Sequence, residues 1–237
     1  MTIYTKPYNG NKPKFNEFQT PVGKVVHCYH DKPQLQQTDS QPPRPVMDEN
    51  GIQKADYKVT LWWPKSFKET ELIPMRQLAG TVVAEAWGPD AISDPWLNLQ
   101  AFLRDGDNPE HNTKRKEYLF GGVYLNFKQA AKPTRHPDGR VTYSGAPGLT
   151  GPYKEDLLPT DLWAGCEARI SGIMFGTEYS GKRFISTRLN NIQKGIEKPD
   201  QPFERIGGDG RPDAKSQFDP LGTMPGAGTG GGFQNIL

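Results

Sequence analysis

Hydrophobic and polar residues alternate most clearly between residues 55 and 63, and this period of two predicts a β-strand. One face would carry Tyr57, Val59, Leu61 and Trp63, and the other Lys58, Thr60 and Trp62. Pro64 follows and is expected to end the strand, because proline cannot donate a ladder hydrogen bond.

A second stretch, from Arg115 to Lys128, also alternates and predicts a strand with aromatic residues on both faces. The two rows are Leu119, Gly121, Val123, Leu125 and Phe127 on one side, and Tyr118, Phe120, Gly122, Tyr124 and Asn126 on the other. If one row is the core, the other presents rings beside Arg115, Lys116 and Lys128, as a single-stranded nucleic acid platform requires. The alternative is a sandwich strand buried on both faces.

One long helix is predicted after the first of these strands. Ser66 followed by Glu69 resembles a capping box, and apolar residues recur at helical spacing up to Gly88. Pro74 suits a first turn, so the regular helix is expected to start later than the box suggests.

Three further strands are predicted, at residues 21–30, 166–175 and 182–193, the last two joined by a short loop typical of a hairpin. Long loops are expected at 31–51 and 133–159. About five strands, one principal helix and two long basic-aromatic loops predict a mainly β protein with an OB-fold, a five-stranded Greek-key barrel. The predicted domains are an N-terminal extension (1–20), the OB-fold domain (21–206) and a flexible, Gly-rich C-terminal tail (207–237).

Composition narrows the class of protein. The chain of 237 residues is 34% hydrophobic, with 26 Gly and 22 Pro, which is typical of β-structure joined by long loops. The mean hydropathy of −0.73 argues against a membrane span, and the N-terminus does not resemble a secretory signal, so an intracellular protein is expected. Five acidic and three basic residues from Pro199 onward leave a net charge of +4 on residues 1–198, out of +2 for the chain.

Few residues suggest catalysis or metal binding. Cys28 and Cys166 are too few for a disulfide framework and are expected to be small buried residues. His27, Cys28 and His30 lack a suitably spaced fourth zinc ligand, and Asp105-Gly106-Asp107 is typical of a tight turn. We expect no enzyme activity, no metal and no cofactor.

Several segments, in order, carry a resemblance to a known family. They are PKS at 64–66, LRDGD at 103–107, YLFGGVYLNFKQAAKP at 118–133, DLWAGCEARISGIMFG at 161–176, LNNIQ at 189–193 and FERIGG at 203–208. Over residues 55–206 the chain resembles a family of bacteriophage single-stranded DNA-binding proteins, long known only as phage proteins of unknown function. The resemblance implies an OB-fold that coats single-stranded DNA during phage replication or recombination, without catalysis, in the cytoplasm of the infected bacterial host.

The candidate DNA-binding residues follow from this chemistry. Rings stack on bases without reading sequence, and Lys or Arg beside them bind phosphates. The stacking candidates are Trp62, Tyr118, Phe120 and Tyr124, and the phosphate candidates are Lys58, Arg115, Lys116, Lys128, Arg169 and Arg188.

Other partners and functions remain open at this level. The tail carries Phe233, Ile236 and Leu237 after a glycine run, and could recruit phage replication proteins or be a plain disordered end. Self-association is a further possibility. The alternatives to DNA binding are an RNA-binding OB module, a β-sandwich virion or assembly protein, and a phage nuclease or deaminase, for which the sequence offers no ligand set.

Overall fold

The computed structural model describes residues 16–38, 40–67, 69–93, 102–179 and 182–206. The predicted flexible tail and most of the predicted N-terminal extension lie outside these residues. The end of that extension is part of the fold, since Asn16–Gln19 forms strand β1 and pairs with β9. Within the described residues, no helix combines the length and the apolar character needed to cross a bilayer.

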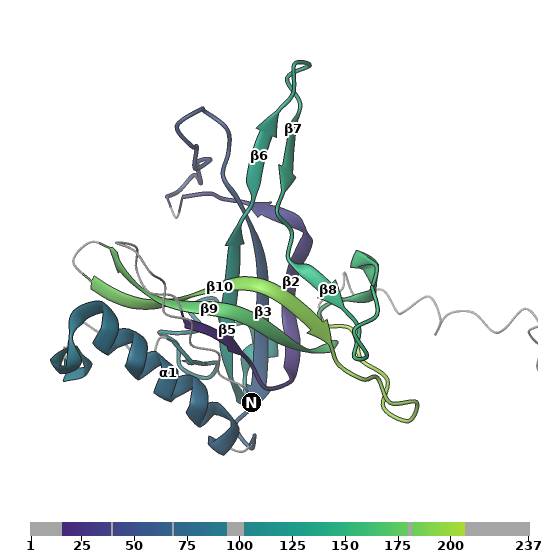
Figure 1. The fold of residues 1–237 in the computed structure, drawn as a ribbon. Coiled ribbons are helices and arrows are strands. Elements are labelled where there is room, and N and C mark those ends of the chain that lie inside the picture. The colour runs from purple at the N-terminus through teal and green to yellow at the C-terminus, as the bar shows by residue number, and fades with distance from the viewer. Residues whose placement is uncertain (1–15, 39, 68, 94–101, 180–181, 207–237) are drawn as a thin grey trace, which may run out of the picture. The chain divides into compact units, whose positions relative to one another are not determined.

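Five strands close into a barrel (Figure 1). They are β2 (Gly23–Leu35), β3 (Ala55–Pro64), β5 (Gly122–Ala130), β9 (Glu167–Tyr179) and β10 (Lys182–Lys194). Each pairs with the next in the order β2, β3, β5, β10, β9, and β9 closes the ring on β2; β5 and β10 are parallel and the other pairs antiparallel. This is the Greek-key connectivity of a five-stranded OB-fold, so the predicted fold is confirmed and the β-sandwich alternative is wrong.

Short elements decorate this barrel. They are β4 (Arg104–Asp105), which pairs with β5, β8 (Gly148–Thr150), which pairs with β10, and the 3₁₀ turns η1 (Pro89–Ser93), η3 (Glu117–Leu119) and η4 (Pro159–Asp161).

The barrel interior is filled by alternate residues of neighbouring strands. On β3 and β5 the facing pairs Val59 with Phe127 and Leu61 with Leu125 point inward and are buried. Tyr57 and Trp63 are buried as well, so the predicted separation of the β3 residues into two rows is confirmed. The side chains that alternate with these buried residues point outward, so Lys58, Thr60 and Trp62 lie on the outer face of the barrel.

Helix α1 (Glu69–Trp87) covers one end of the barrel through buried Leu72, Met75, Leu78 and Val82 (Figure 1). The helix and its apolar stripe are as the sequence predicts. The placement expected for Pro74 is wrong, because this proline lies inside the helix rather than in its first turn. A proline there removes one intrahelical hydrogen bond, the one that its N–H would have donated to the carbonyl of residue 70, and the helix continues past it.

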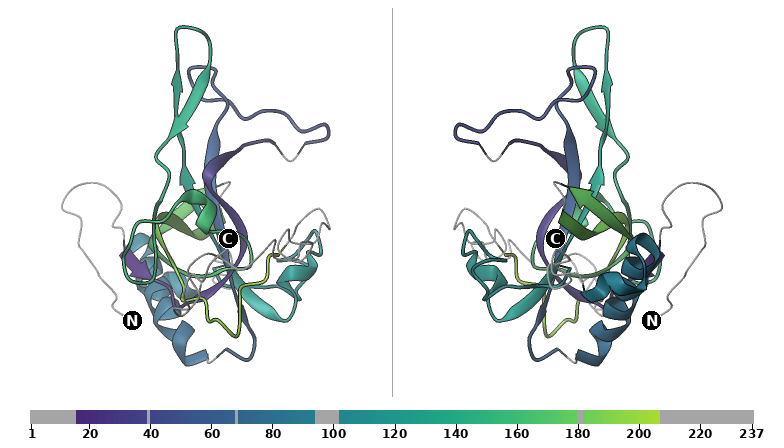
Figure 2. Two further views of the ribbon diagram at one scale, coloured as in Figure 1. Left: turned by 90° about the vertical axis from the view of Figure 1, so that its right-hand side faces the viewer. Right: turned by 90° about the vertical axis from the view of Figure 1, so that its left-hand side faces the viewer.

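The long loop predicted at 133–159 contains three short strands. β6 (Lys132–Arg135) and β7 (Val141–Ser144) form a hairpin that extends away from the barrel, with β8 after it (Figure 2). The turn is Asp138-Gly139, with Gly139 at a positive φ of 82° and His136 donating its backbone N–H to the Arg140 carbonyl. Asp-Gly is a strong hairpin pattern, and the surrounding prolines obscure it in the sequence.

The strand predicted from Arg115 begins only at Gly122. Arg115 has a positive φ of 46°, residues 117–119 form the turn η3, and Gly121 has a φ of 70°. The alternation over 115–121 is therefore accidental: these residues belong to a loop that ends where Gly121 turns the chain into β5.

Candidate nucleic-acid interface

Polar and aromatic side chains form transverse rows across the outer face of β2, β3 and β5. In antiparallel neighbours, directly opposed residues share a face. One row is Tyr29, Lys58 and Lys128, the next is His27, Thr60 and Asn126, and the third is Lys24, Trp62 and Tyr124. Thr60 donates its hydroxyl to Asn126 Oδ1 at 2.7 Å, and the rings of His27 and Tyr29 meet edge to face with centroids 4.8 Å apart.

A loop formed by residues 105–121 lies against one side of these rows, and hydrogen bonds fix it there. Buried Asn112 donates its amide to the carbonyls of Gly106 and Lys116 and accepts the Lys116 N–H. Tyr124 donates its hydroxyl to the His111 carbonyl at 2.7 Å. Because the loop is tied to itself and to β5 in this way, the lysines at 114 and 116 have a defined position.

The Asp-Gly-Asp segment anchors the start of this loop. Lys65 Nζ forms salt bridges with Asp105 Oδ1 at 3.1 Å and with Asp107 Oδ2 at 2.6 Å. Asp107 also accepts a hydrogen bond from the Gly121 N–H. These hydrogen bonds lower the pKa of Asp107, with the Lys65 bond the largest cause. A Cβ on Gly106 would overlap the Leu119 carbonyl oxygen, so only glycine fits there. The segments at 64–66 and 103–107 that carry the family resemblance are thus in direct contact.

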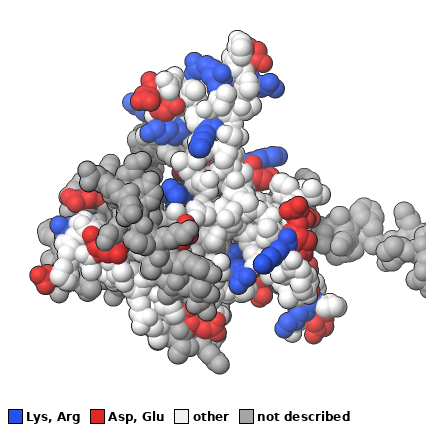
Figure 3. All heavy atoms as spheres, viewed as in Figure 1, with Lys and Arg blue, Asp and Glu red and all other residues white. Residues whose placement is uncertain are grey.

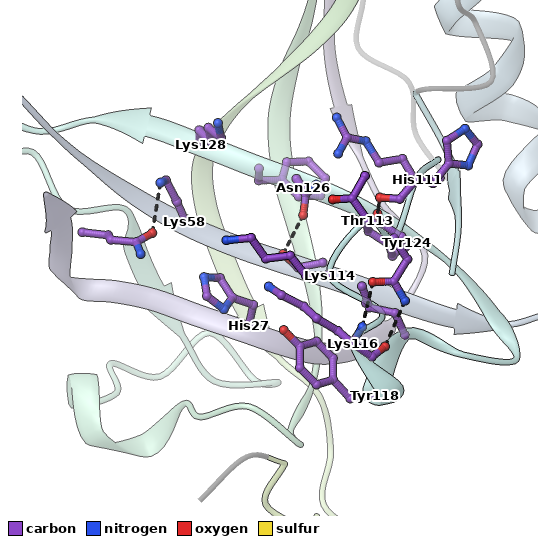
Figure 4. A pocket seen from close by; sticks show the side chains of 16 residues that line it. His27, Lys58, His111, Thr113, Lys114, Lys116, Tyr118, Tyr124, Asn126 and Lys128 are labelled. Carbon is purple, nitrogen blue, oxygen red and sulfur yellow. Dashed lines mark hydrogen bonds between the residues drawn. The ribbon is translucent and has the colours of Figure 1, made fainter. Parts of the chain in front are cut away.

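Between the outer strand face and the loop lies a cavity of about 350 Å³. Five cationic side chains line it: Lys58, Arg104, Lys114, Lys116 and Lys128. Among the described residues that line it there is no carboxylate. In Figure 4 the ends of Lys114 and Lys116 and the ring of His27 point into the same space. By contrast, the face seen in Figure 3 carries acidic and basic side chains interspersed.

Burial, together with the neighbouring lysine charges, lowers two pKa values in the cavity. Burial lowers the pKa of His27, and the charges of Lys116 and Lys58 lower it further. Burial and the charge of Lys128 lower the pKa of Lys58, against the opposing effect of Asp56, whose carboxylate lies 4.0 Å from the ammonium. His27 is therefore neutral near pH 7, and an anion bound beside it would relieve the repulsion.

Aromatic faces accompany these cations. Tyr118 lines the cavity and is half-buried, with Lys116 Nζ 5.6 Å from its ring centroid. Tyr29 is 40% exposed beside Lys58. A ring next to an ammonium can hold a base and its phosphate at neighbouring positions.

The structure brings half of the predicted site residues together. Lys58, Lys116, Tyr118, Tyr124 and Lys128 line the cavity. Tyr124 is only 4% exposed and lies under the loop, so its ring supports the site rather than presenting a face. Arg188 lies beside Lys128 on the neighbouring strand β10, outside the cavity.

The other predicted residues lie elsewhere. Trp62 packs over Gly122 and donates its indole N–H to the Leu119 carbonyl, so it braces the loop. Arg115 and Phe120 are exposed on the loop and do not line the cavity, because the expected strand is not formed there. Arg169 lies on β9, bonds Gln193 at 2.6 Å and lines a different cavity, together with Lys154.

Sequence reasoning missed several lining residues, namely His27, Thr60, Arg104, Lys114 and Asn126. Thr60 shares a strand face with Lys58, and Asn126 shares one with Tyr124. The alternation that identifies Lys58 and Tyr124 therefore also identifies Thr60 and Asn126. Lys114 has no such pattern, because a loop held by Asn112 places it, and Arg104 lies on the two-residue strand β4, opposite Tyr124 of β5.

The Cys28 and His30 pair faces the interior. Burial raises the pKa of Cys28 to about 12, so its thiol is protonated, and its Sγ is hydrogen-bonded to His30 Nδ1 at 3.0 Å. Cys166 is buried, as predicted. In the part of the chain that the structure describes, no three His, Cys, Asp or Glu side chains are grouped as metal ligands would be.

Known proteins similar to this chain are found among solved structures. No family model and no curated protein matches the chain. The chain is similar to the single-stranded DNA-binding protein from bacteriophage Enc34, at 15% identity and a TM-score of 0.48 over 92% of this chain and 100% of that one. The same protein in complex with ssDNA matches at 15% identity and a TM-score of 0.47, over 80% of this chain and 89% of that one. A third match is gp2.5, a single-stranded DNA-binding protein encoded by bacteriophage T7. It matches at 13% identity and a TM-score of 0.47, over 89% of this chain and 99% of that one.

These proteins are of the kind that the sequence resembles. All three TM-scores are below 0.5.

Proposed function

We propose that this protein binds single-stranded DNA, without sequence preference and without catalysis, in the cavity between the outer face of β2, β3 and β5 and the loop of residues 105–121. The observation that carries the proposal is the lining of that cavity: five cations, no carboxylate among the described lining residues, and half-buried Tyr118 beside Lys116.

Each part of the lining suits one part of a nucleotide. The ammonium groups of Lys58, Lys114, Lys116 and Lys128 would neutralise phosphates and release counterions. Tyr118 in the lining, and Tyr29 beside Lys58 on the same strand face, would stack on bases, a contact worth about 1–3 kcal/mol per base. Because a stacking ring needs an exposed base face, the cavity favours a single strand over a duplex.

The position in the fold agrees with this role. In OB-folds generally, oligonucleotides bind on the face of the second and third barrel strands, which here are β3 and β5. Because one fold hosts many functions, the function is inferred from the lining residues. The sequence resemblance supports a role in coating single strands during phage DNA replication or recombination, in the host cytoplasm.

The test is fluorescence-anisotropy titration of labelled oligo-dT, a duplex of matched length and a matched RNA at about 50 and 200 mM salt. We expect tight binding to the DNA single strand that weakens markedly at the higher salt, and weak binding to the duplex. Equal affinity for single strand and duplex would overturn the proposal, and tighter binding to RNA would reassign it to an RNA-binding module.

A further inference from the structure

The barrel wall is incomplete between β5 and β10. β3 and β5 pair at nine consecutive positions, whereas β5 and β10 have a single paired position, Lys128 with Arg188. Before this position the two strands are joined by a side chain instead: Thr187 donates its hydroxyl to the Asn126 carbonyl at 2.6 Å. We call the opening between residues 125–128 and 185–187 the seam.

The seam contains its own cavity of about 220 Å³. Its floor is apolar, formed by buried Phe102 and Leu125 and by half-buried Ile185. Polar groups surround the opening: Ser186, Asn126, and the cations of Arg104 and Lys128. No carboxylate occurs among the described residues that line it.

The seam adjoins the proposed DNA-binding cavity. Arg104, Asn126 and Lys128 line both, so the two spaces meet across these three side chains. Figure 4 shows Asn126 and Lys128 among the side chains that line the first cavity. A phosphate lying on Arg104 and Lys128 would have one cavity on each side of it.

We propose that the seam is a second nucleotide subsite, in which one base of the bound single strand inserts between β5 and β10. The proposal rests on the proposed function, since the strand that supplies the base is the one held by the first cavity. The base ring would lie against Phe102, Leu125 and Ile185. Its polar edge would meet the Ser186 hydroxyl and the Asn126 amide, whose Oδ1 already accepts Thr60 and whose Nδ2 is the donor.

Ile185→Trp tests the subsite, because an indole at this position fills the seam while leaving the lining of the first cavity intact. We expect the variant to bind oligo-dT about tenfold more weakly and to bind an abasic deoxyribose-phosphate chain of equal length as the wild type does. Ile73→Trp, on the exposed face of α1, is the matched control and should change neither affinity.

The outcomes separate the two proposals. Equal weakening of both ligands by Ile185→Trp, or no change in either, would overturn the subsite while leaving DNA binding in place. A wild type that binds neither ligand would instead overturn the proposed function, and the subsite with it.

Photo-cross-linking of the wild type with oligonucleotides containing 5-iododeoxyuridine avoids any folding defect of a variant. We expect cross-links in the peptides that carry Phe102 and residues 184–188, besides those at Tyr118 or Tyr29. Cross-links at the tyrosines alone would overturn the subsite.

Discussion

His27 is a residue whose protonation should respond to an anion in the cavity, because two lysine charges act on it. Its pKa lies below the ordinary 6.5 because burial and then Lys116 and Lys58 disfavour its charged form. Phosphates bound to those lysines would offset their charges and raise the pKa of His27, so binding takes up a proton.

Affinity for oligo-dT should therefore increase as the pH falls from 8 to 6, by at most about tenfold per pH unit for one proton. His27→Gln, which cannot titrate, should remove this part of the pH dependence in anisotropy titrations. Identical pH profiles for the variant and the wild type would contradict the placement of phosphate beside His27.

Tyr118 is the ring we expect to stack on a base. Tyr118→Ala should weaken oligo-dT binding roughly 5- to 150-fold, the equivalent of one lost stacking contact. Tyr153→Ala is the control, because Tyr153 is 79% exposed on a loop outside the cavity. Comparable losses in the two variants would show that the Tyr118 ring has no special role.

At the level of elements, the loop of residues 105–121 determines whether the site exists. Gly106→Ala would force the loop away from Leu119, because a Cβ at 106 overlaps that carbonyl, and the Gly106 N–H would lose its bond to Gly122. We expect oligo-dT affinity to fall more than about tenfold, as Lys114 and Lys116 are displaced, while far-ultraviolet circular dichroism still shows the β-barrel.

Gly80→Ala is the matched control for that experiment. Gly80 lies in α1 and has open space where alanine would add its methyl group, because no atom other than those of the adjacent residues and the helix's own backbone lies within 4 Å. Alanine should therefore stabilise the protein by about 0.5–1 kcal/mol and leave binding unchanged. Unaltered DNA binding by Gly106→Ala would mean that the loop is not part of the site.

Two segments, β3 and the loop before β5, show which parts of the fold the sequence can predict. Alternation over 55–63 identifies β3 and both of its faces, because one face is fully buried and the other polar. The same pattern over 115–121 is misleading, because a left-handed Gly121 and the side chain of Asn112 impose a loop that local alternation does not encode. Half of the candidate site residues consequently lie in the cavity, and the cations on the loop are identified only in part.

For the whole molecule, the net charge of +2 is uninformative about binding, since charges of both signs are mixed on the face in Figure 3. The cavity concentrates positive charge locally, on lysines contributed by two strands and one loop. Short-range contacts with phosphate, rather than a long-range field, should therefore set the affinity.

The measurement that tests binding of the single strand in this cavity most directly is the salt dependence of oligo-dT affinity. It compares the wild type with the Lys114→Ala/Lys116→Ala variant. Each lost phosphate contact should reduce the slope of log K against log salt by about 0.7, so the double variant should lose about 1.4. Arg169→Ala, which alters a cation on β9 outside the cavity, should keep the wild-type slope. Parallel slopes for the double variant and the wild type would contradict binding of the single strand in this cavity.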